Sequence, residues 1–270
     1  MSTAIPVLLY HSVSDEATPP LARYTLGTGL FAEHAAVIAE QGWRTLTVDG
    51  LTNAIHESTA DLERTLAITF DDGFADTADQ AASILARFGL SATLYVTSGT
   101  VGGMCTWLGR DGRRPMASWQ QLRDLATAGW EIGAHSVDHP ELDVLRRRQR
   151  HAQILGSRTT LRDNLGLPID SFAYPHGYHG GRVRSEVIAA GFRTACAVKN
   201  TLSSSADDPF ARARLTITAD TTGEDLARLL SDACNRDVPS ATGRNDHRAL
   251  AWRCYRRVRH HTTARLGSQR

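Results

Sequence analysis

The chain has 270 residues, of which 41% are hydrophobic and 22% are charged, and its formal net charge is +1. These values are ordinary for a globular enzyme, and the balanced charge gives no indication of a nucleic-acid-binding protein. No apolar run approaches the roughly 20 residues that a membrane-spanning helix needs. The four cysteines are widely separated and form no CxxC pair, so neither a disulfide framework nor a cysteine zinc site is expected.

Short apolar runs alternate with helical patterns through residues 5–235. The expected strands are 5–10, 44–48, 65–70, 92–97, 130–134, 171–174, 193–198 and 214–218. The expected helices are 30–41, 75–88, 118–128, 146–165, 181–190 and 223–235, the third of them capped by Ser118. This alternation predicts an α/β fold with a parallel sheet, and seven or eight units favour a (β/α) barrel, with a doubly wound open sheet as the alternative. Residues 99–117, rich in glycine and arginine, are expected to form a long loop over one face.

The alternating pattern ends near Pro239, which predicts one α/β domain at 1–238 and a basic linker and tail at 239–270. Residues 244–270 contain eight arginines against one aspartate. One face of a short helix there would carry Leu250, Ala251, Cys254, Tyr255 and Val258. We interpret the tail either as a solvated basic segment or as an amphipathic one that contacts a membrane surface or an acidic partner. The first residues, MSTAIPVLLYHS, lack a secretory pattern, so a cytoplasmic protein with reduced thiols is expected.

Titratable residues directly follow several expected strands. His11 follows 5–10, Asp71 and Asp72 follow 65–70, His135 follows 130–134, and Pro175 and His176 follow 171–174. In a parallel barrel the carboxyl ends of the strands meet at one mouth, where catalytic groups gather. Each of these residues alone has a simple structural explanation, such as a turn or a core histidine. Their recurrence at successive strand ends favours a shared site.

His135 and His139 have the i, i+4 spacing that places two imidazoles on one side of a helical turn. Two histidines with one carboxylate form a common catalytic metal site that leaves positions open for water and substrate. Within the Asp71–Asp72 pair, one carboxylate would then bind the metal, and the other would be free to take a proton from water.

Three segments resemble the motifs of a known family. TFDDGF (69–74) and HSVDH (135–139) resemble the first two motifs of the NodB-homology polysaccharide deacetylases, carbohydrate esterase family four. FAYPHGYH (172–179) is similar to the third motif, with Tyr174–Pro175 in place of its arginine–proline step. The resemblance covers about residues 5–218. It implies a distorted (β/α) barrel of about seven strands that removes N-acyl, usually N-acetyl, groups from an aminosugar or glycan with a divalent metal. Zinc is expected, with cobalt or nickel as alternatives.

The resemblance also implies roles for individual residues. Asp71 would be the general base, and Asp72, His135 and His139 would bind the metal. Tyr174, Pro175 and His176 would contact substrate, with the backbone N–H of His176 in the oxyanion site. The side chain of His176 departs from the tyrosine usual at that position.

A second departure concerns the general acid, because no late histidine motif occurs in this chain. VLLYHS at the N-terminus resembles the motif of a subgroup similar to the poly-N-acetylglucosamine deacetylases, which makes His11 the candidate acid, with its pKa raised by an ionised carboxylate. DPFARARLTI (208–217) resembles the end of that subgroup, which implies that Arg214 pairs with Asp71. Two alternatives stay open: an amidohydrolase acting on a small N-acyl or cyclic amide, and a catalytically silent glycan-binding module.

Overall fold

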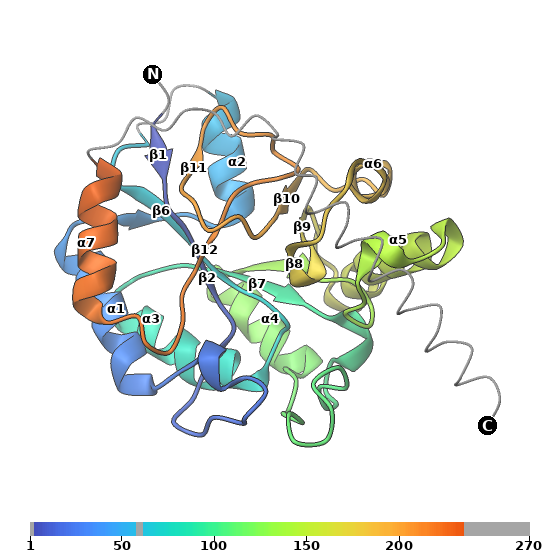
Figure 1. Cartoon of the computed structure of the whole chain (residues 1–270), viewed down its shortest axis with the longest axis horizontal. Helices are drawn as coiled ribbons and strands as arrows, with labels where there is room; N and C mark the ends of the chain where they lie inside the picture. The colour runs from blue at the N-terminus through green and yellow to red at the C-terminus, as the bar shows by residue number, and fades with distance from the viewer. Residues whose placement is uncertain (1–2, 58–61, 235–270) are drawn as a thin grey trace.

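A computed structural model describes residues 3–57 and 62–234 (Figure 1). Its main sheet contains seven strands in the order β10-β9-β8-β7-β6-β2-β12, and every neighbouring pair is parallel. They are β2 (Val7–Tyr10), β6 (Thr65–Phe70), β7 (Thr93–Val96), β8 (Glu131–Ala134), β9 (Ser171–Ala173), β10 (Thr194–Cys196) and β12 (Leu215–Thr216). An eighth strand, β5 (Arg44–Thr45), pairs with the beginning of β6. The expected α/β fold, a distorted (β/α) barrel of about seven strands, is therefore confirmed, and its sheet is a curled half-barrel of parallel strands.

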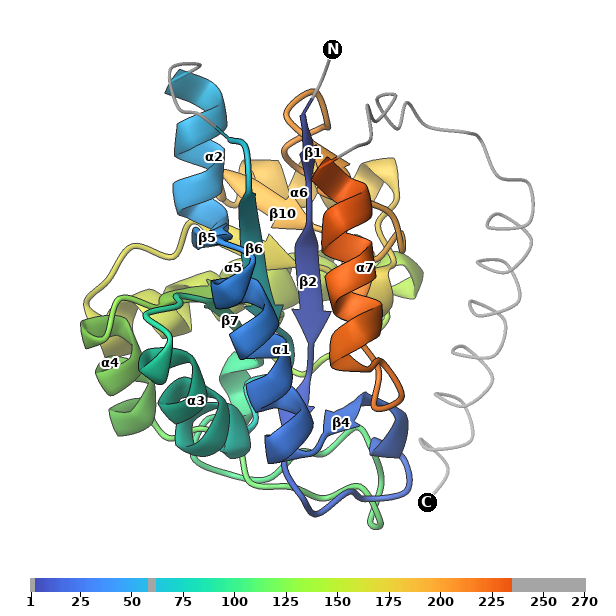
Figure 2. The same ribbon diagram turned by 90° about the vertical axis from the view of Figure 1, so that its left-hand side faces the viewer.

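The sheet curls so far that its two edges approach each other. Cys196 on the β10 edge forms a bridge with Arg212, and the segment then continues into β12, which pairs with β2. Two small pairings lie at the ends of this curled sheet: β1 (Ala4–Ile5) runs antiparallel to β11 (Ser203–Ser204), and β3 (Ser12–Val13) runs parallel to β4 (Thr25–Leu26). Figure 2 shows β2 with its carboxyl end directed toward β4.

Seven α-helices of the described residues surround the sheet (Figure 1). They are α1 (Thr28–Glu40), α2 (Val48–Glu57), α3 (Ala82–Arg87), α4 (Trp119–Thr127), α5 (Arg147–Leu165), α6 (Gly181–Ala189) and α7 (Gly223–Cys234). Short helical turns are η1 (Ala22–Tyr24), η2 (Thr77–Ala81), η3 (Ser98–Thr100), η4 (Leu142–Val144) and η5 (Pro175–Gly177). All six expected helices have a counterpart with ends shifted by a few residues, and each expected strand has a counterpart, of which β6 has the predicted ends.

Alternate residues of the strands belong to two apolar cores. Leu8, Ile68 and Leu94 pack with the helices in the larger core. Their neighbours Val7, Ala67 and Tyr95 belong to a smaller core on the other face of the strands. Because successive side chains of a strand point to opposite faces, the strands must be apolar on both sides. This burial explains why TLAITF is uninterrupted by charge until Asp71.

The sequence prediction was wrong between residues 44 and 57. The expected strand 44–48 covers only Arg44–Thr45, and α2 was not predicted. The first turn of α2 is capped from distant strands: Thr93 Oγ1 accepts a hydrogen bond from the Val48 backbone N–H (3.0 Å), and Glu131 Oε2 accepts one from Asp49 (2.9 Å). Thr47 Oγ1 also accepts a hydrogen bond from the Gly50 backbone N–H (3.1 Å), a local N-cap that the sequence analysis missed.

Among residues 3–57 and 62–234, no helix is both long and apolar enough to cross a membrane. The predicted basic tail at 239–270 lies outside the described residues, as does Cys254. The cysteines at 105, 196 and 234 are free thiols.

Candidate active site

A pocket of about 340 Å³ lies at the carboxyl ends of β2, β6, β8 and β9. It brings together six residues that the sequence singled out: His11, Asp71, Asp72, His135, His139 and His176. They come from segments as far apart as residues 11 and 176. The curled parallel sheet, with its strand ends at one mouth, produces this convergence.

Asp72, His135 and His139 form a compact buried set with one ligand atom each within 4.8 Å of the others. Asp72 Oδ1 lies 3.2 Å from His139 Nε2 and 3.6 Å from His135 Nε2. Among the described residues, no donor hydrogen-bonds to this carboxylate oxygen, although it is buried. A buried carboxylate oxygen facing two imidazole nitrogens fits a divalent cation, because the ion would supply the missing counter-charge.

The protonation states of the two histidines agree with a metal site. Burial lowers the pKa of His135 to about 4 and that of His139 well below its usual value, so both imidazoles are neutral at pH 7, as metal ligands must be. Burial first, and then the negative charge of Asp71, raise the pKa of Asp72 well above its ordinary value. A cation held against Asp72 would offset both effects.

The loop after β8 aims the two histidines, and it is not the helical turn that the i, i+4 spacing predicted. Ser136 and His139 have left-handed backbones, with φ of 66° and 59°. Ser136 Oγ accepts a hydrogen bond from the His139 backbone N–H (3.0 Å) and stabilises the turn. His135 Nδ1 donates to the Ala173 carbonyl of β9 (2.8 Å), which leaves Nε2 facing Asp72.

Backbone strain is concentrated around the pocket. Of the six described non-glycine residues with positive φ, four are at the site: Asp72, Ser136, His139 and His176. Such conformations cost of order 1–3 kcal/mol each and persist where surrounding contacts fix them. Gly73, the glycine of the DDG stretch, has φ of 89°, and a Cβ there would lie 3.3 Å from the backbone of Val96. The sequence therefore needs glycine directly after the two aspartates.

Asp71 has a different partner from Asp72. Arg214 donates to Asp71 Oδ1 at 2.6 Å from Nη1 and to Oδ2 at 2.7 Å from Nη2. Arg214 also donates to the Ala197 carbonyl, and its side chain is completely buried. Burial alone would raise the pKa of Asp71, but the Arg214 guanidinium outweighs it with help from His135, and the pKa is lowered. Asp71 is therefore ionised at neutral pH.

His11 lines the pocket and is partly exposed to it. Its ring centroid lies 5.0 Å from that of Tyr24, and no described residue hydrogen-bonds to its buried Nδ1. We expected a raised pKa for His11, and the structure shows the opposite. Burial lowers the pKa of His11 to about 4, although Asp71 counteracts part of the shift. The free pocket therefore contains a neutral imidazole at this position.

The segment after β9 places its three predicted residues differently. Tyr174 is buried beneath the site, and its hydroxyl donates to the Phe210 carbonyl (2.9 Å), so this side chain does not line the pocket. Pro175 opens the turn η5. His176 is exposed, has φ of 57°, and contacts the ring of His139 edge-on with centroids 4.5 Å apart.

Aromatic residues that the sequence analysis did not single out complete the pocket wall. Tyr24, Trp107 and Tyr178 line it, and Trp107 stacks on His139 with ring centroids 4.7 Å apart and an interplanar angle of 20°. Trp107 belongs to the 99–117 loop, which was expected to cover one face. A tryptophan within a polar, glycine-rich loop was the available signal, but nothing local indicates which strand end it contacts.

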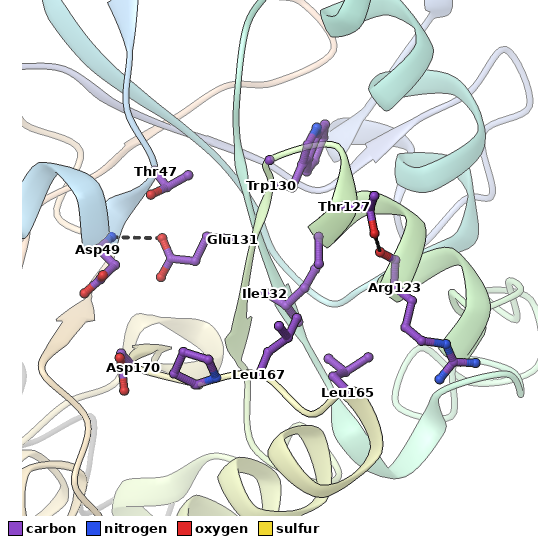
Figure 3. Close-up of a pocket in the computed structure, with 13 residues that line it drawn as sticks. Thr47, Asp49, Arg123, Thr127, Trp130, Glu131, Ile132, Leu165, Leu167 and Asp170 are labelled. Atoms are coloured by element: carbon purple, nitrogen blue, oxygen red, sulfur yellow. Dashed lines mark hydrogen bonds between the residues drawn. The ribbon is translucent and has the colours of Figure 1, made fainter.

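A second pocket, of about 490 Å³, lies at the other end of the sheet near the beginning of β8 (Figure 3). Its three carboxylates are engaged in fixing the fold. Asp49 pairs with Arg193 (2.9 Å), and Asp170 pairs with Arg158 (3.3 Å). Glu131 accepts the hydrogen bond from the Asp49 backbone that Figure 3 marks with a dashed line. Glu131 Oε1 has no hydrogen-bond partner among the described residues, as is also true of Asp72 Oδ1, but no histidine lines this pocket.

Comparison with known proteins identifies the family. The family model described as polysaccharide deacetylase matches residues 59–195, just over half of the chain. This protein therefore belongs to the polysaccharide deacetylase family. The matched region contains Asp71, Asp72, His135 and His139, but neither His11 nor Arg214.

A curated relative is the putative polysaccharide deacetylase YxkH of Bacillus subtilis, which is 24% identical over 190 residues. That alignment covers 70% of this chain and 61% of the relative, so more than a third of the relative is unmatched.

Solved structures share the fold at low sequence identity. The Streptococcus pyogenes deacetylase PplD in complex with acetate has a TM-score of 0.75 at 19% identity, with 85% of this chain and 99% of that one covered. IcaB from Ammonifex degensii gives 0.72 at 21%, with 84% and 97% covered. A de-N-acetylase from Aggregatibacter actinomycetemcomitans gives 0.71 at 17%, with 83% and 99% covered.

Proposed function

We propose that this protein is a metal-dependent hydrolase that removes N-acetyl groups from an aminosugar-containing substrate and releases acetate and a free amine. The observation that carries the proposal is that the neighbouring carboxylates of Asp71 and Asp72 have different partners. One carboxylate is fixed by Arg214, and its neighbour faces two neutral imidazoles in the same pocket. This arrangement supplies a base beside a cation site.

Asp72, His135 and His139 would hold the divalent ion, for which zinc is our choice and cobalt or nickel are alternatives. When bound, the ion would act as a Lewis acid toward the amide carbonyl and lower the pKa of water. His135 is already oriented for this role by the Ala173 carbonyl. Trp107, stacked on His139, would shield that side of the site from bulk water.

Hydrolysis adds water across the amide C–N bond, so one proton must be removed from water and one delivered to nitrogen. Asp71, kept ionised by Arg214, would accept the first. His11 would deliver the second, because an amine leaves poorly unless it is protonated. Since His11 is neutral in the free pocket, it must first take up a proton from solvent, and we infer that negative charge developing on the substrate raises its pKa and favours this uptake. Asp71 returns the proton it took from water to solvent after the reaction. The backbone N–H of His176 would donate to the carbonyl oxygen.

The aromatic wall supports a sugar as the carrier of the acetyl group. Tyr24, Trp107 and Tyr178 offer flat apolar surfaces in the same pocket as the polar groups. Sugar rings present C–H faces that pack against aromatic rings and leave their hydroxyl edges available for hydrogen bonds.

The test is acetate release from a panel of N-acetylglucosamine oligomers, monomeric and lipid-linked N-acetyl sugars, and small cyclic amides, each with the zinc-loaded protein. We expect release from at least one sugar and none with Asp72→Asn. Cleavage confined to the cyclic amides would replace the sugar substrate with a small-amide substrate. Sugar binding without acetate release by metal-loaded protein would indicate a silent binding module.

A further inference from the structure

Three segments contribute residues to the rim of the active-site pocket. The first, His11–Val13, carries the candidate general acid. The second, Leu21–Thr25, carries Tyr24, which lies against His11. The third is the hairpin formed by residues 104–115, which carries Trp107. The relative positions of these segments determine whether His11 and Trp107 face the same substrate.

Asp76, four residues after Asp72, binds the first segment directly. Its Oδ2 accepts a hydrogen bond from Ser12 Oγ (2.8 Å), and its Oδ1 accepts one from the Val13 backbone N–H (3.3 Å). The neighbouring Thr77 donates from Oγ1 to the carbonyl of His11 (3.4 Å). The backbone that follows the His11 side chain is thus fixed from the segment that follows the two aspartates.

The same carboxylate binds the other two segments through Arg114. Arg114 Nη2 lies 3.0 Å from Asp76 Oδ2, and both side chains are largely buried, with exposed fractions of 9% and 13%. Arg114 Nη1 donates to Thr25 Oγ1 (3.4 Å) in the second segment. Arg114 itself belongs to the stem of the hairpin, where its carbonyl accepts from the Cys105 backbone N–H (2.9 Å).

The hairpin stem has further contacts that do not involve this ion pair. The Ala75 N–H donates to the Pro115 carbonyl (3.0 Å), and Leu21, Phe74, Cys105 and Met116 form a small apolar cluster beneath it. Loss of the Asp76–Arg114 pair should therefore loosen the hairpin without unfolding the domain. None of these residues belongs to the proposed ligand set, and Asp76 does not line the pocket.

We propose that Asp76 is a positioning residue that sets the distance between the general acid and the substrate wall. Its contacts with Ser12 and Val13 hold the segment that carries His11. Its contact with Arg114 holds the hairpin that carries Trp107. The role at catalysis rests on the function proposed above, whereas the mechanical coupling of the two rim segments does not. Misplacement of a reacting group by about 1 Å can cost roughly 100-fold in rate, so small shifts of the His11 segment or of the hairpin are measurable.

Three substitutions separate the contacts of Asp76 with the His11 segment from its contact with the hairpin. Ser12→Ala removes one contact between Asp76 and the His11 segment, and Arg114→Gln removes the charged contact between Asp76 and the hairpin. Asp76→Asn weakens both sets of contacts while keeping the side-chain shape. Asp163→Asn is the matched control, because Asp163 also pairs with an arginine, Arg162, but on the exposed surface of α5. Metal content should be unchanged in all four variants.

Hydrogen–deuterium exchange, followed by mass spectrometry of metal-loaded protein, tests the coupling without any substrate. We expect Asp76→Asn to accelerate exchange in both 11–14 and 104–116, Ser12→Ala mainly in the first, and Arg114→Gln mainly in the second. Exchange in α5 should not change. Unchanged exchange in both rim segments of Asp76→Asn would overturn the proposal, and acceleration throughout the domain would reduce Asp76 to a general stability residue.

Kinetics then test the catalytic consequence. Ser12→Ala should lower kcat for the amide more than for an activated ester, whose leaving group needs little protonation, and Arg114→Gln should mainly raise KM. Asp76→Asn should show both effects, with kcat/KM reduced roughly 10- to 100-fold. Equal losses for amide and ester in all three variants would overturn the positioning role. If the wild-type protein releases no acetate from any substrate, the proposed function fails, and the exchange pattern still decides the coupling.

Discussion

Arg214 donates to both carboxylate oxygens of Asp71 although 143 residues separate the two in the chain. The pair lies where the segment leading into β12 approaches the end of β6. Because both side chains are almost fully buried, each depends on the other to offset the loss of hydration. This contact distinguishes Asp71 from Asp72 more sharply than any local feature of the DDG stretch.

The two aspartates should respond differently to the same substitution. Asp72→Asn should weaken metal binding, because it removes the anionic ligand of the three-residue set. Asp71→Asn should keep the metal and lower turnover roughly 100-fold or more, the usual scale for loss of a general base. Metal analysis after gel filtration, together with acetate-release rates, provides the measurement. Equal loss of metal in both variants would show that the roles are assigned wrongly.

His135→Ala or His139→Ala should each abolish stoichiometric metal binding while leaving the fold largely intact. Both side chains line the pocket at the mouth of the curled sheet, so their truncation enlarges the pocket and leaves no new cavity in the apolar core. Circular dichroism should therefore change little as metal content falls. Full metal content in both variants would exclude this ligand set.

The buried pair Asp71–Arg214 should show strong coupling in a double-mutant cycle. Arg214→Met leaves the Asp71 charge buried without its partner and should destabilise the domain by about 3–5 kcal/mol. In the double variant with Asp71→Asn, no charge is left unpaired, so the loss should be smaller than the sum of the two single losses. Urea unfolding of the four metal-free proteins measures this. Additive losses would mean that the two groups do not depend on each other.

The sequence predicted much of this architecture because its signals are local. Ser118 illustrates this, since its hydroxyl accepts from the Gln121 backbone N–H while the Gln121 side chain accepts from the Ser118 N–H, a reciprocal cap readable from the residue types. TLAITF became β6 with the predicted ends, because a continuous apolar run suits a strand buried on both faces.

Other features depend on contacts that no local pattern contains. The HSVDH segment has helical spacing, yet Ser136 and His139 take left-handed conformations in a loop. Trp107 reaches His139 only because the 104–115 hairpin is anchored beside the pocket. The direction of the His11 pKa shift was also missed, since burial within the folded pocket outweighs the nearby Asp71 charge. The residue types of the site could be identified from the sequence, whereas their environments depend on the tertiary structure.

A histidine outside the site should make stability depend on pH. His34 is fully buried, its Nδ1 accepts from the Tyr10 hydroxyl (3.1 Å), and its Nε2 donates to the Thr221 carbonyl (2.9 Å). Burial lowers the pKa of His34, although the Thr221 carbonyl, Glu33 and Asp225 counteract part of the shift. A lowered folded-state pKa means that the unfolded chain binds the proton more readily, so stability is retained above the unfolded pKa of about 6.5 and falls below it.

Urea unfolding at pH 7.5 and pH 5 should therefore show a smaller loss of stability on acidification for His34→Gln than for the wild type. Glutamine offers both a donor and an acceptor but does not titrate. Other buried histidines contribute to both proteins equally, so the difference between them isolates His34. An identical pH dependence in the two proteins would contradict the assignment.

His11 provides the most direct test of the proposed chemistry. It lines the same pocket as His135 and His139, its Nδ1 has no hydrogen-bond partner among the described residues, and it starts the reaction neutral. His11→Ala should keep metal and substrate binding but lose most amide hydrolysis, because the amine then has no proton donor. An activated ester of the same acyl group should be spared, since its leaving group departs without protonation. Steady-state rates for both substrates, measured with equal metal loading, give the comparison. If amide and ester cleavage fall equally, His11 acts as part of the pocket wall, and the proton must come from another group, with His176 and His179 the next residues to substitute.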